Sequence, residues 1–390
     1  MRLLLVIDYK LGYLGGAQTA FTQQALALAA AGHTVTVAAP DASTHAALRS
    51  AGIQTWDAPF RLVIPGADLP LVRNSRRLRA AVALLLRQQR ADLVLVHSEF
   101  GLSAAALQAA TEQRVPTMHT VHTFFWQGPR AAWLAAPLIT AAHAALTGHA
   151  SARVRLAPRR LDSALRGMTL AAARAADLVV SPSHHQAVAL RAAGLDSVLV
   201  LSNTSTERAA GARTGRPLRL LWAARFAPEK RLDVALDAMA IVQRTLGEGA
   251  VQLAVAGGSP PRRPYASSIV FHGRLAPSAV RALMDDAHAC LITSVGFDNQ
   301  PMVAIEAFAS GAPVIVSDPA LAIEFGDAAI TTGQPTAEAL ARIIVCIARD
   351  RGMLDTASAA ARAFSHEATP ARHAAQIERA FLGITTAAAH

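Results

Sequence analysis

The chain has 390 residues, of which 52% are hydrophobic and 16% are charged, so it is too long for one compact core and too apolar to be intrinsically disordered. Its two cysteines, Cys290 and Cys346, exclude a disulfide scaffold and a cysteine-based zinc cluster. The formal net charge of +10 indicates either a solvated basic surface or an anionic partner, which would be a membrane, a nucleic acid or a phosphorylated substrate.

The first half of the chain alternates short apolar runs with stretches of helical periodicity. The first run is broken by Asp8 and Lys10, which is not typical of a signal peptide, so we expect a cytoplasmic protein. Alternating strands and helices are typical of a parallel sheet. Strands are predicted at 3–7, 33–40, 92–98, 115–123, 176–183 and 197–203, and helices at 17–32, 102–111 and 185–193.

A polar, glycine-containing segment, residues 206–217, is predicted to be a linker, and a second alternating series follows it. We therefore predict the α/β class, with Rossmann-like domains at 1–205 and 218–370 that face each other across a cleft. A C-terminal helix and tail, 371–390, would pack back on the N-terminal domain. The second series has predicted strands at 218–225, 251–258, 268–273, 289–294 and 312–318, and helices at 234–246, 277–288, 301–310 and 336–349.

Residues 131–152 do not fit the alternating pattern, because they contain no Asp, Glu, Lys or Arg. Their number is enough to cross a bilayer, which takes about 20 apolar residues. The segment is mostly alanine, however, and it contains Pro137 and His143, so it is only weakly apolar. A buried or amphipathic inserted helix is the favoured interpretation over a membrane span.

The strongest local signal lies in residues 298–318, where Asp298 and Glu306 are eight positions apart. Pro301 stands where a helix would begin, so Asp298 would precede that helix, and backbone N–H groups at its start would attract a phosphate. A helix with Asp298 as its N-cap and Glu306 exposed explains the same spacing. Spacing alone favours this simpler interpretation.

Two cations in the segment 223–233 form a second signal, since Arg225 would end a strand and Lys230 would open the next helix. Such a pair can neutralise a diphosphate without a metal. A solvated basic turn is the alternative, but Lys230 is one of only two lysines in the chain. A separate turn at Gly15 and Gly16 permits close approach of the backbone to a ligand, although it lacks the full dinucleotide-binding pattern.

His119 and His122 lie toward the C-terminal end of a predicted strand, the position at which α/β enzymes place catalytic groups. Since they are three residues apart, they would not face the same side of a strand, and a metal-binding pair is not expected. The sequence also contains no Asp-x-Asp pattern for a divalent metal. We therefore expect neither a metal nor a resident cofactor.

Taken together, these segments resemble the retaining glycosyltransferases of family four, which have the GT-B fold. The resemblance extends over almost the whole chain and includes the Gly-Gly turn, the histidine-bearing strands, the loop 223–233 and the segment 298–318. In that last segment the family has two glutamates separated by seven residues. Here the first is Asp298, whose shorter arm shifts the carboxylate by roughly 1.5 Å. The resemblance suggests no role for residues 131–152.

The resemblance implies that a nucleotide-sugar donor is bound mainly by the C-terminal domain. By position, Glu306 would bind the ribose hydroxyls. Arg225 and Lys230 would hold the diphosphate, together with the backbone N–H groups of Met302 and Val303.

The resemblance also implies contacts with the sugar and the base. Asp298 and the amides of Asn299 and Gln300 would bind the hydroxyls of the transferred sugar. His122 would contact the same sugar, and the loop around Arg274 would frame the base.

The implied reaction is the retaining, metal-independent transfer of a hexose to an acceptor hydroxyl, with the donor as co-substrate. Gly15 and Gly16 would approach the phosphate and the acceptor from the N-terminal domain. The cations would stabilise charge on the leaving diphosphate, so no enzyme nucleophile is required. The alternatives are a sugar-nucleotide epimerase on the same fold and a non-enzymatic nucleic-acid-binding protein. Sparse aromatic residues disfavour the second alternative.

Arginines are concentrated at 73–90 and at 153–166, and the second cluster directly follows the uncharged segment. Basic residues beside an apolar helical face are typical of proteins that lie on an anionic leaflet. This pattern predicts peripheral binding to the inner face of the cell membrane, with a small-molecule or lipid-linked acceptor. Solvated helix faces in an arginine-rich chain would give the same pattern.

Overall fold

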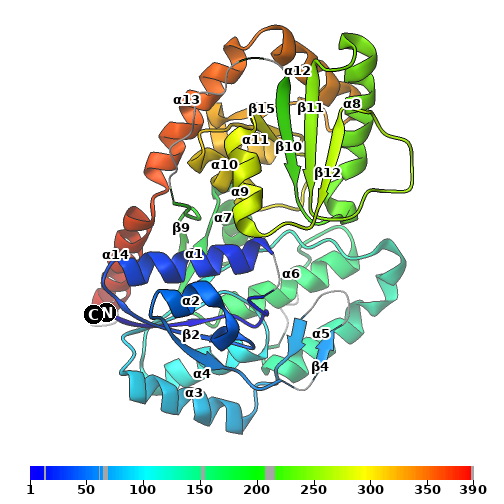
Figure 1. Ribbon diagram of the computed structural model, residues 1–390. Coiled ribbons are helices and arrows are strands. Elements are labelled where there is room, and N and C mark those ends of the chain that lie inside the picture. Colours follow the sequence, from blue (N-terminus) through cyan, green and yellow to red (C-terminus); the bar gives the residue numbers. More distant parts are fainter. Residues whose placement is uncertain are drawn as a thin grey trace. The chain divides into compact units, whose positions relative to one another are not determined.

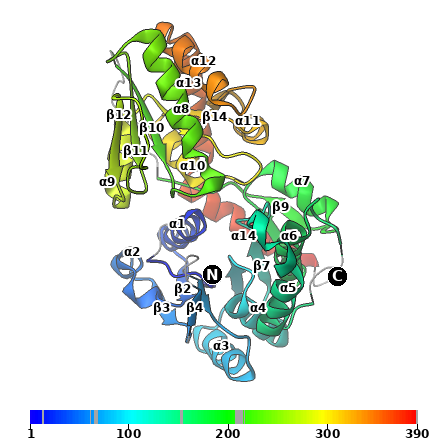
Figure 2. The ribbon, with the colours of Figure 1, turned by 90° about the vertical axis from the view of Figure 1, so that its right-hand side faces the viewer.

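The computed structural model describes residues 1–12, 15–60, 62–64, 69–150, 154–206, 215 and 217–387 (Figures 1 and 2). The chain divides into two compact units, one made of Met1–Thr204 with Pro370–His390 and the other of Ser205–Thr369. Each contains a parallel sheet, so the predicted α/β class with two Rossmann-like halves is confirmed. Most of the segment 206–217, which we predicted to be a linker, lies outside the described residues.

The first unit contains a seven-stranded parallel sheet in the order β3-β2-β1-β6-β7-β8-β9. In its first strand, Leu3 and Leu5 point to one face and Leu4 and Val6 to the other, and all four are buried. A strand that is apolar on both sides requires helices on both faces of the sheet. The strands are β1 (Arg2–Val6), β2 (Thr34–Ala39), β3 (Gln54–Asp57), β6 (Leu93–Val96), β7 (Thr117–Thr120), β8 (Leu178–Ser181) and β9 (Val198–Val200), with a separate antiparallel pair β4 (Leu62–Ile64) and β5 (Leu69–Leu71).

Helices α1, α2 and α14 cover one face of this sheet, and α3, α4, α6 and α7 cover the other. The last helix of the chain lies against α1, where its Ala374 and Ile377 join the same buried cluster as Phe21 and Leu28 (Figure 1). The bounds are α1 (Gly16–Ala30), α2 (Ala46–Ser50), α3 (Arg76–Gln89), α4 (Gly101–Gln113), α5 (Ala136–Thr147), α6 (Arg160–Ala173), α7 (His184–Ala192) and α14 (Pro370–Ala387), with short 3₁₀ helices at Ala42–Thr44 and Arg130–Ala135.

The uncharged segment 131–152 forms the end of the second 3₁₀ helix and then α5, which packs against α4 and α6. Nε2 of the buried His143 donates a hydrogen bond to the carbonyl oxygen of Glu99, 2.7 Å away. The opposite face of α5 is exposed and includes Leu138, which is 73% exposed. No helix in the described part of the chain is long and apolar enough to cross a membrane. The segment is thus an inserted helix with one buried and one exposed face.

Helix α3 contains four arginines of the first basic cluster, and of these Arg76, Arg77 and Arg87 are exposed. Its apolar residues, among them Val82 and Leu86, are buried in the core beside α4. The apolar run 82–86 is therefore mostly packed inside the unit, apart from Leu84, which is 47% exposed. Its hydrophobicity serves the packing of the unit.

The second unit contains a six-stranded parallel sheet in the order β12-β11-β10-β13-β14-β15. Alternate residues of its first strand again point to opposite faces, with Leu220 and Trp222 on one side and Leu221 on the other. The strands are β10 (Leu218–Ala223), β11 (Val251–Ala256), β12 (Ile269–Gly273), β13 (Ala289–Ile292), β14 (Val314–Val316) and β15 (Ala329–Thr331).

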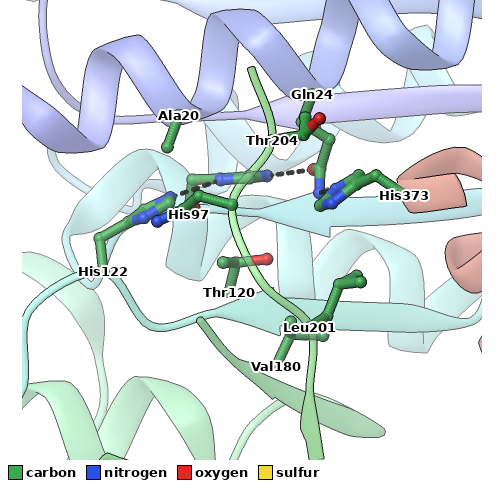
Figure 3. Close-up of a pocket in the computed structure, with 10 residues that line it drawn as sticks. Ala20, Gln24, His97, Thr120, His122, Val180, Leu201, Thr204 and His373 are labelled. Carbon is green, nitrogen blue, oxygen red and sulfur yellow. Dashed lines mark hydrogen bonds between the residues drawn. The ribbon is translucent and has the colours of Figure 1, made fainter. Parts of the chain in front are cut away.

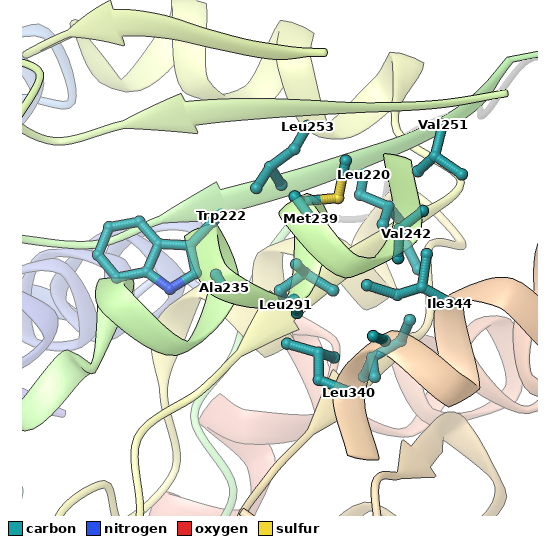
Figure 4. Packing of buried hydrophobic residues seen from close by; sticks show 14 of the residues in the cluster. Leu220, Trp222, Ala235, Met239, Val242, Val251, Leu253, Leu291, Leu340 and Ile344 are labelled. Atoms are coloured by element: carbon teal, nitrogen blue, oxygen red, sulfur yellow. The ribbon is translucent and has the colours of Figure 1, made fainter. Parts of the chain in front are cut away.

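Helices α8 and α12 pack on one face of this second sheet, α9, α10 and α11 pack on the other, and α13 contributes buried residues to both sides. Figure 4 shows Trp222 with the leucine, valine and methionine side chains of the buried core between this sheet and helices α8 and α12. Its indole Nε1 donates to Thr293 Oγ1 at 3.0 Å, which satisfies its one polar atom. The bounds are α8 (Leu232–Leu246), α9 (Pro277–Asp286), α10 (Met302–Ala309), α11 (Pro319–Phe325), α12 (Ala337–Arg349) and α13 (Gly352–Glu367), with 3₁₀ helices at Pro228–Lys230 and Gly326–Ala328.

Candidate active site

In each sheet the strand order reverses at one point, between β1 and β6 in the first unit and between β10 and β13 in the second. Loops that leave the carboxyl ends of the strands on either side of such a point diverge, and ligands of open α/β sheets bind in the space between them. The loop after β10 contains Arg225 and Lys230, and the loop after β13 contains Asp298. The topology therefore gathers three predicted site residues in one place.

Lys230 and Asp298 are in direct contact, although they come from two separate sequence signals. Lys230 Nζ lies 2.5 Å from Asp298 Oδ1, and Ser294 Oγ donates to the other carboxylate oxygen at 2.5 Å. The side chains of the pair are only 18% and 11% exposed. The ammonium group also lies over the ring of Phe297. A partly buried cation and a carboxylate are thus held together at the reversal point of the second sheet.

Helix α10 begins at Met302, and its N-cap is Pro301. The interpretation of Asp298 as the N-cap is therefore wrong, as is the placement of Pro301 within the first turn, because the carboxylate of Asp298 bonds to Lys230 and Ser294 instead. Next to this N-terminus, the predicted sugar-binding and phosphate-binding residues Asn299, Gln300 and Met302 are buried, and Val303 and Glu306 are half-buried. Glu306 is thus not the exposed residue of the simpler interpretation.

Arg225 lies in the same loop as Lys230 but makes a different contact. Its side chain is 47% exposed, and its Nη2 lies 3.5 Å from Glu229 Oε1. Just behind it, Gly257 has φ +132°, and a Cβ at that position would lie 1.8 Å from the carbonyl oxygen of Ala224. Only glycine permits this close approach, which sets the path of the backbone that leads into Arg225.

Within the second unit, Arg274 lies apart from the two strands whose loops carry Lys230 and Asp298. Arg274 is exposed and follows β12, the edge strand, which is separated from β10 by β11. The two glycines belong to the first unit, where Gly15 is the N-cap of α1 and Gly16 is its first residue. A Cβ on Gly15 would lie 2.4 Å from Gln18 Oε1, so a larger residue would displace that side chain.

The reversal point of the first sheet contains two buried acids, Asp8 after β1 and Glu99 after β6, which we did not predict as site residues. Asp8 accepts hydrogen bonds from the backbone of Leu102 at 2.7 Å and from Ser98 Oγ at 2.8 Å, and its pKa is raised by burial. Burial, followed by the charge of Asp8, raises the pKa of Glu99 to about 8. The sequence signal was Asp8 itself, which interrupts the apolar run of the first strand.

His122, which follows β7, lies beside His97, which follows β6 (Figure 3). His122 Nε2 and His97 Nδ1 are 2.8 Å apart, and the two rings are stacked. Burial lowers the pKa of His122 to about 4 and that of His119 to about 3. His119 lies within β7 itself and is buried, whereas His122 follows the strand and is half-buried.

Within the described ranges, no group of three His, Cys, Asp or Glu side chains is arranged to hold a metal ion. Sequence reasoning did not identify His97, Gln24 and His373, which line the small pocket next to His122. Gln24 is hydrogen-bonded to His97, 73 positions away in the sequence, and to His373, 349 positions away. No local sequence pattern could therefore have identified these residues.

Comparison with known protein families shows to which group of proteins the chain belongs. Residues 14–204 match Glycosyltransferase Family 4, and residues 217–350 match Glycosyl transferases group 1. The two matches lie in order and together span most of the sequence. The chain belongs to the GT-B glycosyltransferases. No curated protein matches its sequence.

Several solved structures share the fold of this chain. This glycosyltransferase is similar to sucrose-phosphate synthase from Thermosynechococcus elongatus, with 18% identity, coverage of 99% of this chain and 100% of the other, and a TM-score of 0.71. It is similar to HepE from Anabaena in complex with UDP and glucose, with 16% identity, coverage of 98% and 100%, and a TM-score of 0.69. A protein assigned as a UDP-N-acetylglucosamine 2-epimerase from Listeria monocytogenes matches with 15% identity, coverage of 96% and 94%, and a TM-score of 0.56. The fold is therefore shared by enzymes with different reactions.

Proposed function

We propose that this glycosyltransferase moves a hexose from a nucleotide-diphosphate sugar to an acceptor hydroxyl, with retention of configuration and without a metal. The observation that carries the proposal is the contact between Lys230 and Asp298 at the reversal point of the second sheet. In a nucleotide-sugar donor the diphosphate is joined directly to the sugar. Its binding site therefore needs a cation for the diphosphate next to a carboxylate for the sugar hydroxyls. The crystal structure of HepE with UDP and glucose supports the donor class.

In this proposal the second unit binds the nucleotide. Lys230 and Arg225 hold the diphosphate, and the N–H groups at the start of α10 add to the positive potential there. Glu306, half-buried in the second turn of that helix, binds the ribose hydroxyls. Asp298 binds the transferred sugar, with Asn299 and Gln300 beside it.

The remaining predicted residues complete the donor and acceptor sites. His122 contacts the transferred sugar, and Arg274 frames the base. Gly15 and Gly16 leave the start of α1 open for the phosphate and the acceptor.

The proposed chemistry needs no covalent enzyme intermediate. As the bond from the sugar to the diphosphate breaks, negative charge grows on the departing phosphate oxygen, and the two cations stabilise it where it develops. The acceptor hydroxyl attacks the same face of the sugar, and its proton passes to that phosphate oxygen. A nucleoside diphosphate and a new glycosidic bond with retained configuration result.

A panel of UDP-, GDP- and dTDP-sugars tests the reaction class. One donor should raise the melting temperature, and the same donor should release nucleoside diphosphate when an acceptor is supplied. EDTA should leave the initial rate unchanged, because two cations replace the metal in neutralising the diphosphate. Strict dependence on Mg²⁺ or Mn²⁺ would contradict metal independence. Interconversion of the sugar nucleotide without transfer to an acceptor would instead identify an epimerase.

We also infer that the first unit binds an anionic membrane surface, which would suit a lipid-linked acceptor. The support is the exposed side of the inserted helix, where Leu134 and Leu138 are 71% and 73% exposed. Exposed Arg155 and Arg160 lie close to this helix in the chain, and the second of them opens α6, which packs against α5. Arg153, a member of the same predicted cluster, lies outside the described residues.

Co-sedimentation with vesicles tests this inference. The protein should bind vesicles that contain anionic lipid, release at high salt and ignore neutral vesicles, because each arginine near the surface contributes about 1 kcal/mol. Leu138→Gln should weaken binding several-fold. Ile323→Gln is the matched control, since Ile323 is 84% exposed but lies in the second unit. Equal binding to neutral and anionic vesicles, or none to either, would exclude an anionic surface as a partner.

A further inference from the structure

Four side chains of the first unit form an unbroken series of hydrogen bonds, which we call the histidine relay (Figure 3). His122 Nε2 lies 2.8 Å from His97 Nδ1, and His97 Nε2 lies 2.7 Å from Gln24 Oε1. Gln24 Nε2 lies 2.8 Å from His373 Nε2. The series ends where His373 Nδ1 lies 3.0 Å from the carbonyl oxygen of Ser202.

The relay runs from the interior of the unit to a half-buried histidine. Its inner members His97, Gln24 and His373 are 2%, 3% and 6% exposed, whereas His122 is partly accessible. They come from four different elements: α1, the loops after β6 and β7, and α14. The pocket that they line has a free volume of about 10 Å³, which is the space of roughly one water molecule. The side chains are therefore fixed by their neighbours.

The carbonyl oxygen of Ser202 gives the relay a direction. A carbonyl can only accept, so His373 must carry its proton on Nδ1. A neutral His373 then accepts at Nε2, and the atom of Gln24 that faces it must be the amide nitrogen. In this orientation the amide oxygen of Gln24 faces the ring of His97.

The same logic fixes the next two rings. The amide oxygen of Gln24 accepts from His97 Nε2–H, so His97 Nδ1 carries a lone pair. That lone pair can only accept from His122 Nε2–H. Among the described residues, His122 Nδ1 has no protein partner, and it is left as an acceptor. A chain of four donors thus points from His122 to the Ser202 carbonyl.

All three rings are neutral near pH 7, as this direction requires. Burial lowers the pKa of His122 to about 4 and that of His373 to about 4. The pKa of His97 is lowered well below its usual range, by burial first and then by the neighbouring His122. Each ring therefore has one N–H donor and one acceptor nitrogen, as the series of hydrogen bonds requires.

We propose that the histidine relay holds His122 in the tautomer with its proton on Nε2, so that Nδ1 accepts a hydrogen bond from a hydroxyl of the transferred sugar. This assignment rests on the proposed function for the contact between His122 and the sugar. His97, Gln24 and His373 are positioning residues, because they act only through His122. The last helix of the chain would then determine the hydrogen-bonding character of a site residue that lies about 250 positions earlier in the sequence.

The tautomer can be measured directly in the whole protein with ¹⁵N-labelled histidine, by long-range correlation of ring protons with ring nitrogens. The signals of His122 are assigned by their loss in His122→Ala. We expect a protonated Nε2 and an unprotonated Nδ1 for both His122 and His97, and the opposite pattern for His373. A protonated Nδ1 on His122 would overturn the proposal, whatever the activity of the enzyme.

Two substitutions of Gln24 test whether the relay controls the tautomer. Gln24→Met keeps the length of the side chain but removes the acceptor for His97, so His97 and His122 should populate both tautomers. The turnover number should then fall by about tenfold, the effect of one lost hydrogen bond, with unchanged affinity for the nucleoside diphosphate. Gln24→Glu is the matched control, since its carboxyl group still accepts from His97 and should keep the tautomer of His122. An unchanged tautomer in Gln24→Met would overturn the proposal.

The outcome separates the relay from the proposed function. If His122→Ala retains full transferase activity, the contact between His122 and the sugar is wrong, while the tautomer measurement still decides whether the relay fixes the ring. If His122→Ala is inactive but the tautomer is independent of Gln24, the proposed function stands and the relay proposal falls.

Discussion

Lys230→Ala should lower kcat/KM at least tenfold and up to about a hundredfold. A charge-assisted hydrogen bond contributes roughly 1.5–3 kcal/mol, and each 1.4 kcal/mol corresponds to a factor of about ten in rate. Lys230 is 18% exposed, so little water screens its charge from a bound diphosphate. The measurement is steady-state kinetics with the donor found in the binding panel. Wild-type kinetics would contradict the assignment of Lys230 to the diphosphate.

The partner of this lysine should respond differently. Asp298→Ala should mainly reduce turnover, because we place its carboxylate on the reacting sugar, whereas Asp298→Glu should keep activity. The losses of Lys230→Ala and Asp298→Ala should be less than additive in the double variant, since the two groups are in contact. Arg263→Ala is the matched control, because it breaks an exposed ion pair with Asp237 in the same unit. A strictly additive double variant would show that the observed contact has no part in catalysis.

Both sheets were predictable because their strands are buried on both faces. A strand of that kind appears in sequence as a continuous apolar run, and Leu3 to Ile7 and Val314 to Val316 were identified on that basis. The short strands β3 and β15 were missed. All four residues of β3 are exposed or half-buried, so this strand carries no such run, and β15 has only three residues, of which one is buried.

The contacts within the candidate site could not be predicted, because they depend on strand order. Nothing in either segment indicates that Lys230 and Asp298, 68 positions apart, would meet. Strand β13 lies next to β10 in space, although two strands separate them in sequence, and this neighbour relation creates the pair. The histidine relay depends in the same way on the packing of α14 against α1.

The contribution of Glu99 to the stability of the first unit should fall as pH rises from about 4.5 to about 8. Burial, and then the charge of Asp8, raises the pKa of Glu99 from 4.5 to about 8 in the folded state. Between these two values the folded protein keeps a proton that the unfolded chain has released. The contribution of Glu99 therefore decreases with pH throughout this window and levels off above it. Buried histidines such as His122 and His373 contribute with the opposite sign between about 4 and 6.5, because the unfolded chain binds the protons that they exclude.

Glu99→Gln removes this titration while it keeps the size and shape of the side chain. The variant should lose this contribution and melt several degrees above the wild type at pH 8.5, since 1 kcal/mol shifts the melting temperature of a unit this size by about 2–4 °C. Glu112→Gln is the matched control, because Glu112 is an exposed carboxylate on α4, the helix that follows Glu99. Thermal melts from pH 4.5 to 9 measure the difference. Parallel curves for wild type and Glu99→Gln would show that the carboxyl group ionises normally, because a group with the same pKa in both states cannot change stability with pH.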